Sequence, residues 1–360
     1  MRPLIPLAAA LTMISLTTPT QSNDWIAPPA LRPGDTIAIV APANSTDSRD
    51  FAEIAAVMEG WGYRVRLASN LQERHGNLAG DDELRAQAFM EAWLDPEVRM
   101  VWCATGGYGT TRLFEHLDFE AIRANPKILA GMSDITGLHL AIGREARLIT
   151  FLGPNAIWPI IRDDAGPCLY AERWTWRALR EDQYFDESGN PLPPGYTYEF
   201  PTEPRDEAQG EDVRDPPKTV VPGVAQGRLV GGNLSLVAAT VGTPWQIETE
   251  GRLLVLEDVR EAPYRVDRML CQLDLAGLLD NCAGVILGTW RLCAPEEPER
   301  SLSLDQVFHH YFAGRDYPVM SNFPTGHAPE QAMLPLGCLA ELDAGGPRLT
   351  LLENPVTLSR

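Results

Sequence analysis

Short apolar runs alternate with stretches of helical apolar spacing through the first half of the chain. The runs that predict strands are 35–43, 63–68, 99–107 and 127–133. Helical spacing predicts helices over 48–61, 81–94, a stretch after Gly109, and 135–146. Strands that alternate with helices at this distance form a parallel sheet covered on both faces, so this half is predicted to be an α/β lobe.

The pattern is interrupted between about 162 and 222, where Pro-Pro, Gly-Pro and Gly-Asn pairs and acidic clusters replace the periodicity. Alternation then returns, with strands predicted over 227–233, 252–259 and 284–290 and helices over 234–241, 264–279 and 304–312. We therefore expect two α/β lobes, 23–165 and 221–360, joined by a linker or extended loop over 166–220. A cleft between lobes is a common ligand site.

Charge narrows the choice of partners. The 360 residues carry 30 Lys and Arg against 49 Asp and Glu, for a formal net charge of -19. Such a field repels phosphate backbones and anionic lipid headgroups, so nucleic acid is not an expected partner.

The first 22 residues resemble a secretory signal peptide. Met1 and Arg2 supply a positive charge, an apolar stretch follows to Leu16, and Thr17 to Ser22 are small and polar. The stretch is too short to span a bilayer comfortably, so no stable membrane anchor is expected. The sequence thus predicts a periplasmic protein; an apolar tail that stays on the chain is the alternative.

The chain has six cysteines, all of them after the predicted signal peptide. Their spacing shows no CxxC or CxH pattern, and several lie in apolar runs where cysteine often behaves as a small apolar residue. We expect mostly thiols, with at most one disulfide. The residues are Cys103, Cys168, Cys271, Cys282, Cys293 and Cys338.

GMSDIT, at 131–136, lies where a predicted strand meets a predicted helix. A bare turn would explain it. The alternative is Ser133 held at a sharp bend, with backbone N–H groups of the following helix directed at whatever binds there.

A nucleophilic serine needs a base, and His327 is the strongest candidate. It lies in PTGHAP, where Gly326 and Pro329 flank it in a rigid loop, and loops often carry functional residues. The other histidines lie in a polar loop or in helical patterns, where a surface or packing role is more typical. These are His75, His116, His139, His309 and His310.

Glu257 is the candidate carboxylate that would orient the histidine. It ends the apolar run RLLVLE, where a charged side chain is costly without a partner. Asp258 and Glu261 remain competitors. The glycine-rich ATGGYGTTR at 104–112 matches no phosphate-loop pattern. Its Gly106 and Gly107, with the backbone N–H of Asp134, are candidates to stabilise an oxyanion.

Taken in order, several segments resemble the LD-carboxypeptidase family of serine peptidases, which also contains the microcin C self-immunity peptidases. They are LRPGDTIAIVAPA, CATGGYGTTRLFEHLDFEAIRANPKILAGMSDITGLHLAI, GRLVGGNLSLVAATVGTP, LVLEDVREAPYRVDRMLCQL, AGVILG and GHAPEQAMLPLG. The resemblance implies a Rossmann-like (flavodoxin-like) N-terminal domain that carries Ser133. It also implies a C-terminal β/α domain that carries Glu257 and His327, with no metal and no cofactor.

The activity implied is removal of the C-terminal D-alanine from the tetrapeptide stem of a muropeptide. Dimers are common in the family, so a homodimer is a further expectation. Two departures leave the exact peptide open: Thr105 replaces a frequent Arg before GGYG, and GPN at 153–155 replaces a frequent GPM. The alternatives are an immunity-type peptidase that cleaves an aminoacyl-nucleotide, and a non-catalytic periplasmic peptide-binding protein.

Overall fold

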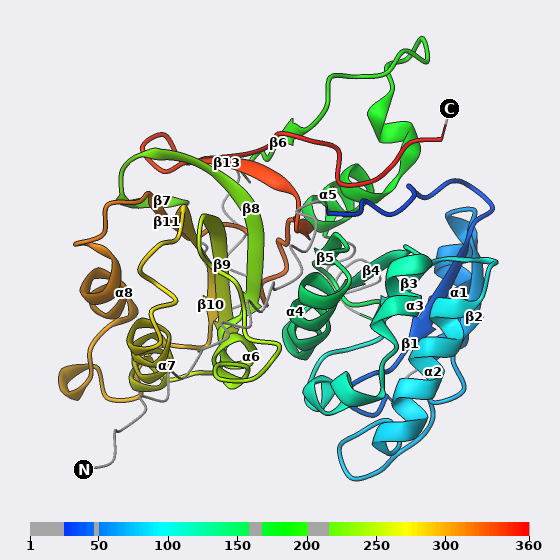
Figure 1. Cartoon of the computed structure of the whole chain (residues 1–360), viewed down its shortest axis with the longest axis horizontal. Helices are drawn as coiled ribbons and strands as arrows, with labels where there is room; N and C mark the ends of the chain where they lie inside the picture. Colours follow the sequence, from blue (N-terminus) through cyan, green and yellow to red (C-terminus); the bar gives the residue numbers. More distant parts are fainter. Residues whose placement is uncertain (1–24, 47–49, 158–167, 201–215, 360) are drawn as a thin grey trace, which may run out of the picture.

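The computed structural model describes residues 25–46, 50–157, 168–200 and 216–359, which form two α/β lobes side by side (Figure 1). The predicted signal peptide, 1–22, lies outside these residues. Within the described ranges, no helix is both long and apolar enough to cross a membrane. The fold class predicted from the sequence is confirmed.

The N-terminal lobe is built on a six-stranded sheet in the order β12-β5-β4-β3-β1-β2, with parallel pairing from β5 to β2. Every residue of central strand β1 is buried, as its unbroken apolar sequence requires. The strands are β1 Thr36–Val40, β2 Arg64–Leu67, β3 Val98–Cys103, β4 Ile128–Gly131 and β5 Thr150–Leu152. The helices are α1 Phe51–Gly60, α2 Asp82–Leu94, α3 Phe119–Ala124 and α4 Thr136–Glu145.

The glycine-rich loop and the helix after it differ from the prediction. The strand expected over 99–107 ends at Cys103, because the glycine-rich loop that follows turns away through left-handed backbone at Gly107 and Gly109. The helix expected after Gly109 is a 3₁₀ helix, Thr110–His116.

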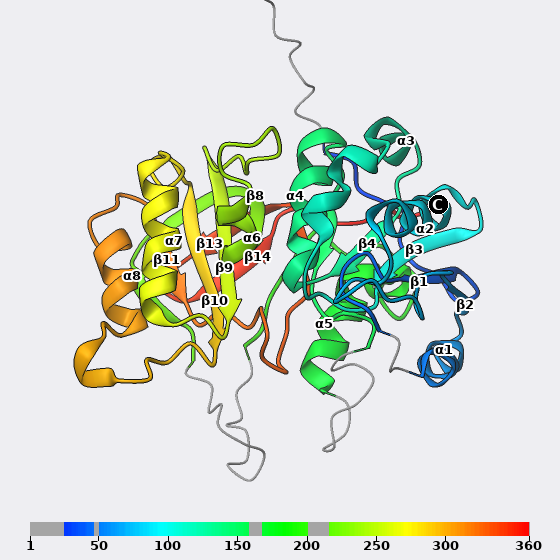
Figure 2. The same cartoon turned by 90° about the horizontal axis from the view of Figure 1, so that it is seen from below.

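The C-terminal lobe contains an eight-stranded sheet in the order β6-β14-β13-β8-β9-β10-β11-β7. Its centre, from β8 to β11, is parallel, and its two edges are antiparallel. The helices of this lobe gather on one side of the sheet (Figure 2). The central strands are β8 Val224–Asn233, β9 Arg252–Val259, β10 Gly284–Arg291 and β11 Val319–Ser321, and the outer strands are β13 Leu339–Asp343 and β14 Arg348–Leu351. The helices are α6 Leu234–Ala239, α7 Pro263–Leu275 and α8 Leu304–Phe312.

The prediction of a linker or extended loop over 166–220 is wrong for much of the described part of this segment. It contains helix α5 (Leu169–Leu179) and strands β6 (Tyr196–Thr197) and β7 (Lys218–Val221) of the C-terminal sheet. The Trp174 ring on α5 lies 4.8 Å from that of Tyr198, and both side chains are buried. This segment is therefore part of the core; residues 201–215 lie outside the described ranges.

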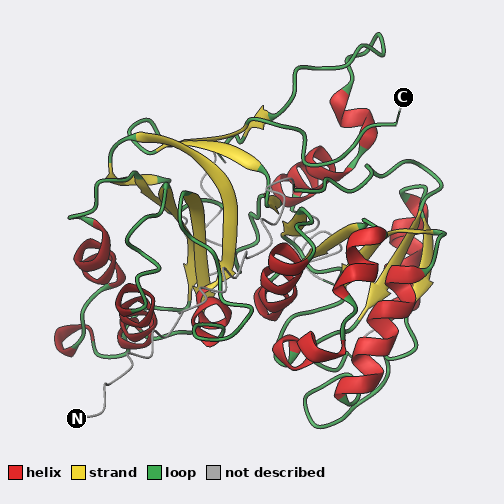
Figure 3. Ribbon diagram, viewed as in Figure 1, coloured by secondary structure: helices red, strands yellow, loops and turns green. Residues whose placement is uncertain are grey.

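The chain also crosses between the lobes a second time. Strand β12 (Leu334–Leu336) follows the His327 loop and pairs antiparallel with β5 of the N-terminal sheet. Helix α4 lies between the two sheets, where it contacts β8 and α6 (Figures 1 and 3). Any site between the lobes therefore depends on how α4 and β12 are held.

Candidate active site

Ser133 occupies a strained turn between β4 and α4. Its φ is 62°, in the left-handed region that costs a non-glycine residue energy and recurs at functional sites. Residues Ser133–Ile135 form a 3₁₀ turn that runs directly into α4. The side chain is partly exposed, although the residues on either side are buried. The strand-to-helix bend predicted from GMSDIT is therefore present.

Two buried polar side chains hold this turn in place through hydrogen bonds to its backbone and to the end of β4. Asn155 Oδ1 accepts a hydrogen bond from the backbone N–H of Met132 at 3.0 Å. His139 Nε2 donates to the Gly131 carbonyl at 2.9 Å, and burial lowers the pKa of His139 to about 4, so the ring is neutral. The Asn of the unusual GPN sequence thus supports the nucleophile turn.

The glycine-rich loop packs directly against Ser133. A Cβ at Gly106 would lie 2.7 Å from Ser133 Cβ and 3.0 Å from Ser133 Oγ, so only glycine fits there. Within the described part of the chain, the backbone N–H groups of Gly106 and Gly107 donate no hydrogen bond. Two backbone donors beside a candidate nucleophile match the layout of an oxyanion hole.

Asp134 joins this loop to the turn through its side chain. Its carboxylate accepts from the Thr110 backbone N–H at 2.8 Å, and the Thr110 hydroxyl donates to the Asp134 carbonyl at 2.5 Å. Burial raises the pKa of Asp134, while the Thr110 and Gly109 hydrogen bonds oppose the rise. The Asp134 carboxylate therefore fixes the position of the glycine-rich loop relative to the Ser133 turn. Only the backbone N–H of Asp134 remains a candidate to stabilise an oxyanion.

His327 and Glu257 form a buried pair on the C-terminal lobe. His327 Nδ1 donates to Glu257 Oε2 at 2.7 Å; the carboxylate is fully buried and the imidazole is 15% exposed. Burial lowers the pKa of His327, but the charge and hydrogen bond of Glu257 and the charge of Asp258 outweigh it, so the pKa is raised. The contact sets the tautomer that leaves Nε2 available as a base.

The three candidate carboxylates have different partners in the structure. Asp258 accepts hydrogen bonds from Asn233 Nδ2 at 2.9 Å and from the Ser235 hydroxyl at 2.8 Å. Glu261 instead faces Arg265, 3.6 Å away. Of the three, Glu257 alone bonds the histidine.

Asn233 connects the two halves of the site and was missed by the sequence prediction. Its backbone N–H donates to the Thr136 hydroxyl at 2.9 Å, three residues beyond Ser133. Its Nδ2 lies 3.4 Å from Glu257 Oε1. The nucleophile turn and the His327–Glu257 pair are thus linked across the lobes through Thr136 and Asn233.

The predicted residues therefore form two groups that this link joins. Ser133, Gly106, Gly107 and Asp134 lie together on the N-terminal lobe, and Glu257 and His327 on the other. The Ser133 hydroxyl makes no hydrogen bond with the described residues, as is often seen before substrate tightens such contacts. Also within those residues, no group of three or more His, Cys, Asp or Glu could hold a metal ion.

Comparison with known proteins identifies the family. The LD-carboxypeptidase N-terminal domain matches residues 37–153, and the LD-carboxypeptidase C-terminal domain matches residues 226–342. The chain belongs to the LD-carboxypeptidase family. The two matched regions contain all the predicted site residues.

Three relatives cover nearly the whole chain. A probable murein peptide carboxypeptidase of Bacillus subtilis (strain 168) is 38% identical over 316 residues, 88% of this chain and 91% of its own. The muramoyltetrapeptide carboxypeptidase from Oxalobacter formigenes superposes with a TM-score of 0.72 at 26% identity, covering 88% of this chain and 97% of its own. The microcin C7 self-immunity protein MccF superposes with a TM-score of 0.80 at 25% identity, covering 92% and 100%. The LD-carboxypeptidase fold is thus shared with relatives of two named activities.

Proposed function

We propose that this LD-carboxypeptidase is a serine enzyme that removes the C-terminal D-alanine from murein tetrapeptide stems. The observation that carries the proposal is the buried His327–Glu257 pair, linked through Asn233 to the strained Ser133 turn. Relatives named murein peptide and muramoyltetrapeptide carboxypeptidases support the choice of substrate.

In the proposed reaction, Ser133 Oγ attacks the carbonyl carbon of the amide before the terminal D-alanine. His327 Nε2 accepts the hydroxyl proton and passes it to the leaving amine, while Glu257 stabilises the imidazolium. Water, activated by the same histidine, then releases the tripeptide from the acyl-enzyme. The backbone N–H of Asp134, with that of Gly106 or Gly107, would stabilise the oxyanion, worth roughly 3–4 kcal/mol where one such donor has been removed.

An assay of wild type beside Ser133→Ala on muramoyl-tetrapeptide tests this proposal. Wild type should release D-alanine, detected by mass spectrometry, and the variant should lose turnover while it stays folded by circular dichroism. Release at the wild-type rate by Ser133→Ala would eliminate the serine mechanism.

One observation favours a second candidate function. The superposition on MccF has a higher TM-score than that on the muramoyltetrapeptide carboxypeptidase, and MccF has been solved with aspartyl sulfamoyl adenosine. The alternative is therefore cleavage of an aminoacyl-nucleotide amide by the same three residues. Cleavage of an aminoacyl sulfamoyl adenosine, with no release from the tetrapeptide, would favour it. Affinity for the peptide without turnover of either compound would point instead to a binding protein.

We also propose that the enzyme acts in the periplasm. The layout of residues 1–22 supports this, because it follows the charged, apolar and small-polar order of a signal peptide. Cell fractionation with N-terminal sequencing of the mature protein tests it. An intact Met1 on cytosolic protein would rule it out.

A further inference from the structure

Helix α4 connects the nucleophile to a second contact between the lobes. The Ser133 turn leads into the first residue of α4, Thr136, so the serine moves with the helix. A ten-residue helix is a rigid rod about 15 Å long. Its beginning is bound to the C-terminal lobe by the Thr136–Asn233 hydrogen bond.

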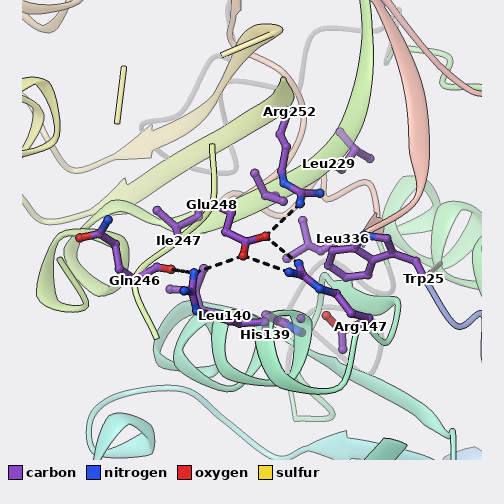
Figure 4. Close-up of a pocket in the computed structure, with 15 residues that line it drawn as sticks. Trp25, His139, Leu140, Arg147, Leu229, Gln246, Ile247, Glu248, Arg252 and Leu336 are labelled. Carbon is purple, nitrogen blue, oxygen red and sulfur yellow. Dashed lines mark hydrogen bonds and ion pairs between the residues drawn. The ribbon is translucent and has the colours of Figure 1, made fainter. Parts of the chain in front are cut away.

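The other end of α4 is bound to the C-terminal lobe by the Glu248 carboxylate and by the Gln246 carbonyl, which accepts a hydrogen bond from Arg144 at 3.1 Å. Glu248, in the segment between α6 and β9, accepts hydrogen bonds from Arg147 at 2.6 and 3.0 Å and from Arg144 at 3.3 Å (Figure 4). Arg252, on β9, approaches the same carboxylate at 2.9 Å. Three guanidinium groups from two lobes therefore converge on Glu248.

This cluster differs from an ordinary surface ion pair. The side chains of Arg147 and Arg252 are only 13% and 14% exposed, and Arg147 binds both oxygens of Glu248. The Arg147 hydrogen bond lowers the pKa of Glu248 against the effect of burial, and the charges of all three arginines lower it further. Without the carboxylate, Arg147 and Arg252 would repel each other in a partly buried space.

We propose that Glu248 is a positioning residue for Ser133. The Thr136–Asn233 contact fixes one end of α4, and Glu248 fixes the other, so together they set both the position and the tilt of the helix that follows the nucleophile. With Glu248 neutral, the N-terminal lobe turns about the Thr136–Asn233 contact and carries the Ser133 turn with it, so Ser133 loses its alignment with His327. The inference rests on the proposed serine mechanism.

Glu248→Gln tests this role, with Glu250→Gln as the matched control. Glu250 is two residues away, exposed, and in no ion pair with the described residues. The readout is the rate at which a fluorophosphonate labels Ser133, per folded molecule, because it reports the serine's reactivity without any peptide substrate. We expect Glu248→Gln to slow labelling by about 10-fold or more, since a misplacement of 1 Å can cost 100-fold. Glu250→Gln should label like wild type.

A milder variant covers the case in which Glu248→Gln does not fold. Arg144→Gln removes the contacts of a 38% exposed side chain with Glu248 and with the Gln246 carbonyl. It leaves Arg147 and Arg252 paired with Glu248. Its labelling should be slower than that of wild type and faster than that of Glu248→Gln. On muramoyl-tetrapeptide, both variants should lower kcat and leave KM within twofold, because both changes lie at the end of α4 away from Ser133.

The outcomes separate the two proposals. Labelling of Glu248→Gln and Arg144→Gln at the wild-type rate, with a lower melting temperature as the only difference, would show that Glu248 only stabilises the fold. That result would overturn this inference alone. Release of D-alanine by Ser133→Ala at the wild-type rate would remove the serine mechanism, and this inference with it. Slow labelling of Glu248→Gln beside normal labelling of Glu250→Gln would support both.

Discussion

At the residue scale, the contact between His327 and Glu257 determines how the site should respond to pH. Burial and the Arg291 charge lower the pKa of His327, but Glu257 and Asp258 raise it further, so it lies above the ordinary value of about 6.5. A general base must be neutral. The rate should therefore fall as the pH decreases through this raised pKa.

Glu257→Gln tests that dependence. Removing the charge should move the acid limb of kcat/KM to lower pH and reduce kcat about 10⁴-fold, the effect of the equivalent change in another triad. Glu261→Gln is the matched control, because Glu261 faces Arg265 and not the histidine. An acid limb that stays in place in Glu257→Gln would assign the titration to another group.

Gly106 gives a second residue-scale prediction. A methyl group there would lie 2.7 Å from Ser133 Cβ, so Gly106→Ala should displace the turn or the loop and lower kcat by about 10-fold or more. Gly60→Ala is the control, because a Cβ at Gly60 meets nothing within 4 Å and alanine favours the α1 helix. Steady-state kinetics and melting curves on both variants decide. Equal kcat in the two would show that the loop accommodates the methyl group.

Residues with an unusual local sequence were the ones that the sequence could single out as candidates. A serine between strand and helix and a glutamate after an apolar run are both costly placements, which is why Ser133 and Glu257 were recognisable. Asn233 was not, because an asparagine between a strand and a helix is typical of an N-cap. It does cap α6, through Oδ1 to the Leu236 N–H at 3.4 Å, while its other amide atom serves Glu257 and Asp258.

At the scale of elements, the segment between the two matched domains should contribute to stability. Trp174 of α5 is 3% exposed and packs on Tyr196 and Tyr198. Trp174→Ala should therefore lower the free energy of unfolding by about 3–5 kcal/mol. Leu169→Ala, on the same helix but 74% exposed, should change it little. Urea unfolding followed by circular dichroism measures the free energy of unfolding of both variants. Equal values for the two variants would show that this segment is only a linker.

The same segment shows where sequence patterns stop being informative. Strands β1, β3 and β4 were predictable because burial on both faces demands continuous apolar sequence. Helix α5 was not assigned, because the Pro- and Gly-rich residues around it indicate a loop. Strand β12 is three residues long and includes Pro335, and it pairs with a strand far away in the sequence. No local pattern encodes that pairing.

At the scale of the whole molecule, the site depends on two lobes held together without disulfides. All six cysteines are described, and each is a thiol. Four are buried, and burial raises the pKa values of Cys282 and Cys293 to about 12 and those of Cys103 and Cys338 as well. Buried, protonated thiols are poor nucleophiles, so they resist oxidation even in an oxidising compartment.

Thiol titration should therefore distinguish two classes of cysteine in the purified protein. With the reagent DTNB, the native protein should react quickly at two positions at most, Cys168 and Cys271, which are partly exposed. After unfolding without reductant, all six should react, and reductant should leave the melting temperature unchanged. The double variant Cys168→Ser with Cys271→Ser is the control, because it should abolish the fast reaction while it preserves activity. Fewer than six thiols in the unfolded wild type would reveal a disulfide. That result would contradict lobes held together only by packing, hydrogen bonds and the Glu248 cluster.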